Sequence, residues 1–395
     1  MNERRICLVT ETYPPEINGV ALTLARLASG LRARGHAVSI VCPRRSRPAE
    51  PDAGPDANVE MLQVRGVALP GYRQGRAGLP ATRTLRGRWT TQRPDVVYVA
   101  TEGPLGWSAV RTARQLRLPV FSGFHTRFHE YARHYGARVF APAILRYLRR
   151  FHNRTQGTLV ASSALRAELV ASGFERVSVL GRGVNSDRFS PVHRSATLRA
   201  AWGVGDADLV ALYIGRLAPE KNFPLAIAAY RAMQQVQATA RLVVVGDGPL
   251  RPSLERMHRD LIFCGMRMGG QLAAHYASAD VFLFPSETET FGNVTLEAMA
   301  SGLCVVAYDY AAAGTHIVHG ESGVLAPRGD SRAFVEHAAA LARWSGDLSR
   351  MRRAARDHAA MIGWEEVVDA FERFLAGIAV DDRGPAAVEA LTHTP

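Results

Sequence analysis

The sequence predicts an α/β protein built from two Rossmann-like domains. The chain has 395 residues, of which 47% are hydrophobic, and this length is comfortable for two domains with ample cores. The apolar run 281–284 is followed by a polar, glycine-containing turn and then by a helix-like apolar stretch. This is the pattern of a buried strand, a loop and a helix. The same order opens the chain, where the apolar run 6–10 precedes the turn Asn18-Gly19-Val20 and a leucine-rich stretch.

The loop and helix after the run 281–284 carry the clearest chemistry. Glu289 lies at the carboxyl end of the predicted strand, where open α/β sheets bind ligands, and Glu297 lies about one turn inside the helix. Eight helical positions separate two residues by roughly 12 Å, so the acids suit two hydroxyl-rich groups of one ligand. Gly292 and the amide of Phe291 can approach a diphosphate closely at the helix start. On its own, each Glu is more simply explained as a solvated residue near that start.

The two glutamates form an E-x7-E motif within Glu-Thr-Phe-Gly-Asn-Val-Thr-Leu-Glu-Ala-Met-Ala-Ser-Gly. This segment resembles the donor-site signature of the retaining glycosyltransferases of family 4, and the resemblance covers nearly the whole chain. It implies the GT-B fold, in which two Rossmann-like domains face a cleft and a C-terminal helix crosses back to the first domain. It also implies that Glu289, Phe291, Gly292 and Glu297 bind the nucleotide sugar, with Glu289 acting in catalysis.

The resemblance assigns a cationic pair as well. Arg216 and Lys221 lie in Gly-Arg-Leu-Ala-Pro-Glu-Lys-Asn, and Lys221 is the sole lysine of the chain. In the family these positions bind the donor diphosphate. Two fixed cations stabilise the charge that builds on the leaving diphosphate as the sugar bond breaks. We therefore expect both residues to act in donor binding and in catalysis.

Two positions in the first half of the chain follow predicted strands. The family uses the turn at Gly19 to bring its backbone to the diphosphate, although a simple strand-to-helix turn explains the glycine equally well. His125 follows the predicted strand 118–122, and the segment 123–136 is similar to the His-Thr...Tyr...Tyr-Gly segment of family members that glycosylate lipids. We expect His125 to face the cleft and to act in catalysis, the alternative being a structural histidine.

The domain boundaries follow from these assignments. We expect an acceptor-binding domain over residues 1–188, completed by a last helix at about 364–380, and a nucleotide-sugar-binding domain over residues 189–363. The last helix has apolar residues on one face, and these would pack on the first domain. Residues 381–395 are expected to form a disordered tail.

The charge is uneven along the chain. The net charge is +12, and residues 1–190 hold 29 Lys and Arg against 13 Asp and Glu, whereas residues 191–395 hold 19 against 23. Apolar residues recur beside arginines at three- and four-residue steps over 137–154, which suits an amphipathic helix on an anionic membrane. A core-packed helix with a solvated arginine face explains the same pattern. Nucleic-acid binding is not expected, because no recognised module or base-stacking aromatic array accompanies the charge.

Other sequence features indicate the expected cellular compartment. No apolar run approaches the roughly 18 residues of a spanning helix, and the first residues lack a signal-peptide pattern. The four cysteines have no metal-binding or redox spacing, which is typical of reduced core residues. We expect a cytoplasmic protein that associates peripherally with the inner face of the cell membrane.

Together these features predict a retaining hexosyltransferase that acts on a membrane lipid or glycolipid, with GDP-mannose favoured as donor by the resemblance. We expect no cofactor and no metal, because the cationic pair can do a metal's electrostatic work. One alternative is a UDP-glucose- or UDP-galactose-dependent enzyme acting on a lipid or polysaccharide precursor. Another is a sugar-nucleotide epimerase of the same fold, which needs no acceptor. Front-face attack and a covalent intermediate are both compatible with retention.

Overall fold

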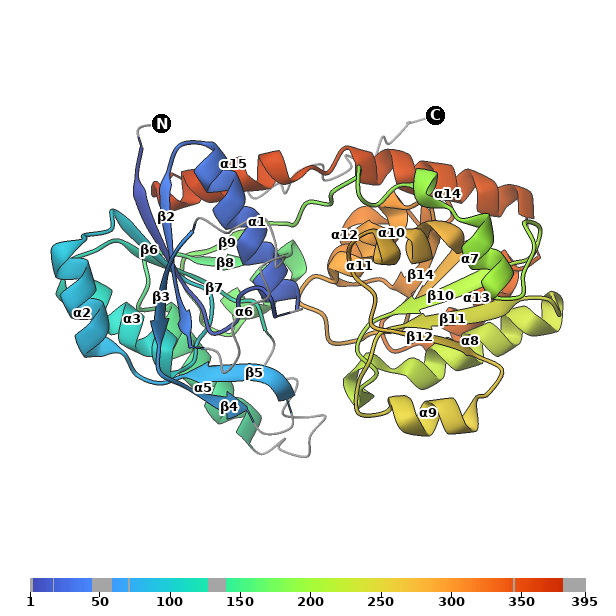
Figure 1. Ribbon diagram of the computed structural model, residues 1–395, viewed down its shortest axis with the longest axis horizontal. Helices are drawn as coiled ribbons and strands as arrows, with labels where there is room; N and C mark the ends of the chain where they lie inside the picture. The colour runs from blue at the N-terminus through green and yellow to red at the C-terminus, as the bar shows by residue number, and fades with distance from the viewer. Residues whose placement is uncertain are drawn as a thin grey trace. The chain divides into compact units, whose positions relative to one another are not determined.

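The structure of the protein is a computed structural model, which describes residues 3–16, 18–44, 59–69, 72–126, 140–343 and 345–378. These residues form two compact α/β units (Figure 1). Unit 1 comprises the described residues up to Arg182 together with the segment from Trp364 onward, and unit 2 runs from Gly183 to Gly363. The chain thus enters unit 2 shortly before the boundary expected at residue 188.

Unit 1 is built on a seven-stranded parallel sheet with the order β3-β2-β1-β6-β7-β8-β9. Its strands are β1 Arg5–Val9, β2 Ala37–Pro43, β3 Glu60–Val64, β6 Val96–Val99, β7 Val120–Gly123, β8 Thr158–Val160 and β9 Val177–Val179. The chain runs outward from β1 through β2 to β3 and then returns to place β6 on the other side of β1. Such a reversal is the switch point at which open α/β sheets bind ligands, outside the carboxyl ends of the strands.

Helices pack on both faces of this sheet. They are α1 Gly19–Ala33, α2 Thr82–Thr91, α3 Pro104–Gln115, α5 Ala141–His152, α6 Ser163–Ala171 and α15 Trp364–Leu375. Ile6 and Leu8 of β1 share a core with α1 and α15, whereas Cys7 and Val9 share another with α2 and α3. Because β1 is buried on both faces, its sequence is a continuous apolar run rather than an alternating one.

The C-terminal helix α15 packs on α1 within unit 1, which confirms the expected return of this helix (Figure 1). The two helices approach closely at Gly30, where a Cβ atom would lie 2.5 Å from Cγ2 of Val368. A buried pair adds to the contact, since Nε2 of His36 lies 3.0 Å from Oε1 of Glu372. Glycine at position 30 therefore fixes how near α15 can come.

Unit 2 has a six-stranded parallel sheet with the order β12-β11-β10-β13-β14-β15. Its strands are β10 Val210–Ile214, β11 Arg241–Val245, β12 Ile262–Gly265, β13 Val281–Phe284, β14 Cys304–Tyr308 and β15 Gly323–Ala326. Its helices are α7 Ala196–Ala201, α8 Phe223–Val236, α9 Arg251–Met257, α10 Gly269–Ser278, α11 Asn293–Ala300, α12 Ala311–His316, α13 Ser331–Leu341 and α14 Ser345–Ala360. The chain order reverses between β10 and β13, which is the switch point of this unit.

The sequence interpretation missed some elements of unit 1. It expected little regular structure over residues 43–94 besides 59–67, yet α2 lies there, as does an antiparallel pair of β4 Gly66–Leu69 and β5 Tyr72–Gly78. Helix α2 buries only Leu85 and Trp89 among polar residues, so its apolar period is too sparse to recognise. Most of the expected lipid-glycosyltransferase segment (residues 127–136) and the expected tail 381–395 lie outside the described residues.

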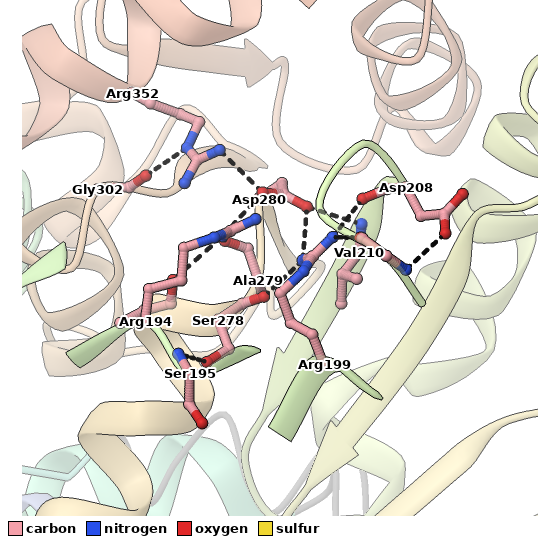
Figure 2. A network of polar contacts seen from close by, with 12 residues as sticks. Arg194, Ser195, Arg199, Asp208, Val210, Ser278, Ala279, Asp280, Gly302 and Arg352 are labelled. Atoms are coloured by element: carbon pink, nitrogen blue, oxygen red, sulfur yellow. Dashed lines mark hydrogen bonds and ion pairs between the residues drawn. The ribbon is translucent and has the colours of Figure 1, made fainter. Parts of the chain in front are cut away.

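A buried ion cluster fastens the first part of unit 2 to its sheet (Figure 2). Asp280, which precedes β13, accepts hydrogen bonds from Arg194, Arg199 and Arg352 at 3.2, 3.3 and 2.8 Å, and from the amide of Val210 at 2.9 Å. Arg199 is 1% exposed and also donates to three backbone carbonyls. One carboxylate therefore serves three guanidinium groups, and its loss would leave a buried positive charge uncompensated.

We expect Asp280→Asn to lower the free energy of unfolding by about 3 kcal/mol, because it removes the one carboxylate of a buried cluster. Urea unfolding followed by circular dichroism measures the effect. Asp260→Asn is the matched control, because Asp260 forms a more exposed pair with Arg231 whose loss should cost below about 1 kcal/mol. Equal destabilisation by the two substitutions would contradict the role given to Asp280.

Candidate active site

An ion pair joins the two loops at the switch point of unit 2. Lys221 lies in the loop after β10, Glu289 lies in the loop after β13, and Nζ of Lys221 donates to Oε1 of Glu289. The side chains are only 18% and 14% exposed. The residues are 68 positions apart in the sequence, so the fold brings together two of the predicted site residues.

Glu220 orients the second predicted cation. It belongs to the 3₁₀ turn Pro219–Lys221 and is buried, and its Oε1 accepts from Nη1 of Arg216 at 3.4 Å. Its backbone carbonyl accepts from the hydroxyl of Thr288 at 3.3 Å, which ties the two loops together again. The side chain of Arg216 is 40% exposed, so its charge is held in place and is still accessible. The sequence interpretation did not assign Glu220, although its place between the two cations was a usable signal.

The loop after β13 is held from its other side by Tyr310. Its hydroxyl group donates to the backbone carbonyl of Glu289, and the guanidinium group of Arg328 lies 4.4 Å from the centre of its ring. Arg328 also donates to the carbonyl of Glu287 at 2.6 Å. These contacts fix the backbone on which the Glu289 carboxylate is carried.

Gly292 and Phe291 have different tasks at the start of α11. Gly292 is the N-cap residue and has a φ of 90°. This left-handed conformation favours glycine, because glycine has no Cβ atom. The ring of Phe291 is buried against His316 at 5.9 Å, and its carbonyl accepts from the amide of Ala312 at 2.8 Å. Phe291 thus anchors the loop, while the helix start can present amides to an anion.

Glu297 has a different environment from Glu289. Its Oε2 accepts from the hydroxyl of Tyr276, on α10, at 2.9 Å. Burial of the carboxyl group raises the pKa of Glu297 to about 7, with the Tyr276 hydrogen bond and the charge of Arg188 acting in the opposite direction. A carboxyl group of this kind can accept from or donate to a ligand hydroxyl near neutral pH.

In unit 1, the predicted Gly19 is the first residue of α1, just after β1 and its loop. The preceding Asn18 caps the helix, since Oδ1 accepts from the amide of Ala21 at 2.9 Å and Nδ2 donates to the hydroxyl of Thr12 at 2.6 Å. The local structure therefore explains the Asn-Gly pair as a helix start. The expected contact between Gly19 and a diphosphate stays a prediction.

Both ring nitrogens of His125 have partners within unit 1. Nε2 lies 3.0 Å from the hydroxyl of Tyr98 and Nδ1 lies 3.0 Å from Nη2 of Arg182. The residue is 8% exposed. Burial lowers the pKa of His125 well below its usual value, and the charges of Arg182 and His152 act in the same direction. This arrangement suits a neutral, oriented ring rather than a proton carrier, and a role for His125 in catalysis stays a prediction.

The sequence interpretation also missed two acids at the switch point of unit 1. Glu11 follows β1, and Glu102 follows β6. Burial raises the pKa of Glu11 to about 7, the nearby charge of Glu102 acts in the same direction, and hydrogen bonds from two backbone amides oppose it. A side chain at Gly103 would place Cβ 1.9 Å from Oε1 of Glu11, so the carboxylate lies against the start of α3. A sequence signal was present, because each acid lies within three residues of the end of an apolar run.

Glu102 belongs to a buried chain of hydrogen bonds. Its Oε1 lies 3.2 Å from Nε2 of His152, and Nδ1 of His152 lies 2.9 Å from Oγ of Ser122. The order of groups resembles the Ser-His-acid arrangement of hydrolases. Ser122 is completely buried and bonds to two threonine hydroxyls, so no substrate can reach its oxygen. The chain is a structural support for the carboxyl end of the sheet.

The described part of the chain contains no group of three or more His, Cys, Asp and Glu residues that could hold a metal ion. Asp206 and Asp208 have an Asp-x-Asp spacing, but they precede β10 and therefore lie at the amino end of the sheet. Oδ2 of Asp208 accepts from the amide of Gly205 at 2.8 Å and closes a local turn. Across the described ranges, no helix is both long and apolar enough to cross a bilayer.

Two family models match the chain. The model for glycosyltransferase family 4 matches residues 17–188, and the model for glycosyl transferases group 1 matches residues 208–343. The sucrose-phosphate synthase of Thermosynechococcus elongatus has a similar solved structure, with a TM-score of 0.77 at 19% identity over 95% of this chain and 99% of that one. This likeness shows the GT-B fold.

Curated relatives agree with these matches. A GDP-mannose-dependent alpha-mannosyltransferase of Corynebacterium glutamicum is 33% identical over 370 residues, which are 92% of this chain and 85% of the relative. An alpha-monoglucosyldiacylglycerol synthase of Streptococcus pneumoniae is 28% identical over 77% of this chain and 71% of the relative. Two family models, a relative of this identity along most of the chain and the loop geometry of unit 2 lead to one assignment. The chain belongs to glycosyltransferase family 4.

Proposed function

We propose that this glycosyltransferase moves mannose from GDP-mannose to a hydroxyl group of a membrane lipid or glycolipid, with retention of anomeric configuration. The contact of Lys221 with Glu289, beside Arg216, is the observation that supports donor binding most strongly. It holds a cation and a carboxylate at one point, as a diphosphate bound to a sugar requires. The preference for mannose rests on the GDP-mannose-dependent relatives alone.

The chemistry follows from these charges. When the bond between the anomeric carbon and the diphosphate breaks, negative charge builds on the leaving oxygen. Lys221 and Arg216 would stabilise that charge more in the transition state than in the bound donor. Without donor, Lys221 and Glu289 neutralise each other; with donor, the ammonium group would turn to the phosphate and the carboxylate to a sugar hydroxyl.

Retention is compatible with attack from the face on which the diphosphate leaves. The acceptor oxygen would form its bond to the anomeric carbon as the diphosphate departs, and the departing phosphate oxygen would take the acceptor proton. No protein base is needed for this step. The protein's part is to fix the donor and supply positive charge, which is the usual protein contribution to reactions that release phosphate.

Helix α5 supports the choice of a membrane acceptor. Arg146, Arg149 and Arg150 are exposed and lie three and four positions apart, so they share one face of the helix. Leu148 and Phe151 lie in the core, while Phe140, at the start of the helix, is 64% exposed. A helix with a basic face and an exposed aromatic ring at its start suits an anionic lipid surface. We place the protein at the cytoplasmic face of a membrane, where such lipids occur.

A second candidate is transfer of glucose from UDP-glucose. It is favoured by the likeness to the alpha-monoglucosyldiacylglycerol synthase. The site residues of unit 2 would act in the same way on this donor, because they address the diphosphate and the sugar hydroxyls rather than the base. A comparison of donors distinguishes the two.

Glu289→Gln should lower turnover at saturating donor by roughly 30-fold, because one charge-assisted hydrogen bond to the sugar contributes about 2 kcal/mol. Steady-state kinetics and GDP binding by calorimetry separate turnover from nucleotide affinity. Glu336→Gln makes the same change at an exposed position of unit 2 and should alter neither. If Glu289→Gln weakens GDP binding and leaves turnover intact, the carboxylate does not act on the sugar.

Lys221→Ala and Arg216→Ala should each lower kcat/KM, and the double variant should lose less than the sum of the two losses. Both cations act on one diphosphate, so their contributions are coupled. The measurement is a double-mutant cycle on kcat/KM, with Arg332→Ala, an exposed arginine of unit 2, as the control. Unchanged kcat/KM in either single variant would remove that residue from the site.

Replacing Arg146, Arg149 and Arg150 by Ser should weaken binding to anionic vesicles at least tenfold, since each arginine contributes about 1 kcal/mol near such a surface. Flotation with vesicles at increasing salt measures this binding, which should fall with salt in the wild type. Replacing Arg332, Arg350 and Arg353 of unit 2 removes the same charge and should have little effect. Equal losses in the two triple variants would reject α5 as the membrane contact.

A further inference from the structure

A buried arginine of unit 1 donates to the ring of His125. Arg182, which follows β9, is 6% exposed, and its Nη2 lies 3.0 Å from Nδ1 of His125. Its Nη1 donates to the carbonyls of Leu180 and Gly181 at 2.9 and 3.0 Å. A guanidinium group has donors only, so Nδ1 of His125 must be the acceptor. A neutral imidazole with a bare Nδ1 carries its proton on Nε2.

The other side of the ring completes the chain of donors. Nε2 of His125 lies 3.0 Å from the hydroxyl oxygen of Tyr98, which therefore accepts the Nε2 proton. A side chain at Gly123 would place Cβ 2.0 Å from that oxygen and 2.4 Å from Nε2. Only glycine leaves room for the contact. A hydrogen-bonded chain thus runs from Arg182, after β9, through His125, after β7, to Tyr98 in β6.

The charges around the ring favour the same state. Three groups face the ring of His125: Arg182 after β9, His152 at the end of α5, and Tyr98 in β6. Glu102 is in turn bonded to His152. Burial lowers the pKa of Arg182 to about 10, so it stays charged near neutral pH. Among the residues that the structure describes, no carboxylate lies within ion-pair distance of Arg182. Its charge therefore acts on His125 and helps to keep the ring neutral.

We propose that Arg182 is a positioning residue that holds His125 in the tautomer with its proton on Nε2. The importance of this tautomer for catalysis rests on the proposed function together with the prediction that His125 acts in the transfer reaction. The tautomer itself can be measured without activity. A ring held in one tautomer presents the same hydrogen-bonding pattern in every catalytic cycle, which is the purpose of such orienting groups.

The test is NMR of the full chain labelled with ¹⁵N-histidine, with the His125 signals assigned from His125→Gln. In the wild type we expect a protonated Nε2 and a bare Nδ1 throughout about pH 6 to pH 8. Arg182→Met should abolish this fixed pattern, and Arg182→Lys should retain it, because lysine supplies a donor and a charge. Arg176→Met, an exposed arginine of the same unit, should change nothing. A proton on Nδ1 in the wild type, or an unchanged pattern in Arg182→Met, would overturn the proposal.

Two further variants keep the test decisive if Arg182→Met does not fold. Tyr98→Phe removes the acceptor but not Arg182, so the bare Nδ1 should persist. Gly123→Ala should displace the ring and lose the pattern.

In transfer assays, loss of Arg182 removes a cause that lowers the pKa of His125, so the ring is protonated at higher pH. The acid limb of the pH profile should then move upward by at least about half a unit.

Different results would reject the proposed function and the role of Arg182. A fixed Nε2–H tautomer in a protein that transfers no sugar would reject the proposed function and leave the role of Arg182 intact. Sugar transfer with an acid limb that Arg182→Met does not move would reject the role of Arg182 in the reaction.

Discussion

The ion pair between Lys221 and Glu289 is the contact on which the candidate site depends. It joins residues 68 positions apart, and it exists because β10 and β13 are neighbours in a parallel sheet. Their carboxyl ends therefore deliver two loops to one place, as parallel sheets do at a switch point. Glu220 and Tyr310 then fix the backbone and the second cation around the pair. The result is a set of charges oriented before any donor arrives, which is the requirement for electrostatic catalysis.

In unit 2, the contacts that stabilise the fold and the residues of the candidate site lie at opposite ends of the strands. At the amino end, Asp280 gathers three arginines, and those contacts tie the start of the unit and α14 to the sheet. At the carboxyl end lie the partly buried acids and cations of the candidate site. Uncompensated charge is costly in both places, but only the second arrangement would exchange partners in the proposed reaction. A rigid amino end gives the carboxyl-end loops a fixed base.

Much of unit 2 could be predicted from sequence because its signals are local. The apolar run of β13, the glycine at 292 and the two glutamates lie within a few turns of one another, so pattern and chemistry coincide. The partners of these groups could not be predicted in the same way. Tyr276 reaches Glu297 from another helix, and such pairings depend on strand order, which periodicity does not reveal.

The partners of site residues were equally hard to predict in unit 1. The position of His125 after a strand could be predicted from the sequence, but its partners Tyr98 and Arg182 lie 27 and 57 positions away. Those contacts change the chemistry inferred for the ring, because they occupy both nitrogens. Helix α2 was missed for another reason, since a helix that buries only two residues leaves almost no apolar period. Site geometry is therefore less predictable than the elements that carry it.

The proposed function is retaining transfer of mannose, with the donor held at the charged switch point of unit 2. The most direct measurement supplies GDP-mannose, UDP-glucose and UDP-galactose in turn, with and without a lipid extract, and determines the anomeric configuration of the product by NMR. We expect GDP-mannose to be consumed fastest, only when lipid is present, and the product to be an α-mannosyl lipid. Donor conversion that needs no acceptor, or a product of inverted configuration, would contradict it.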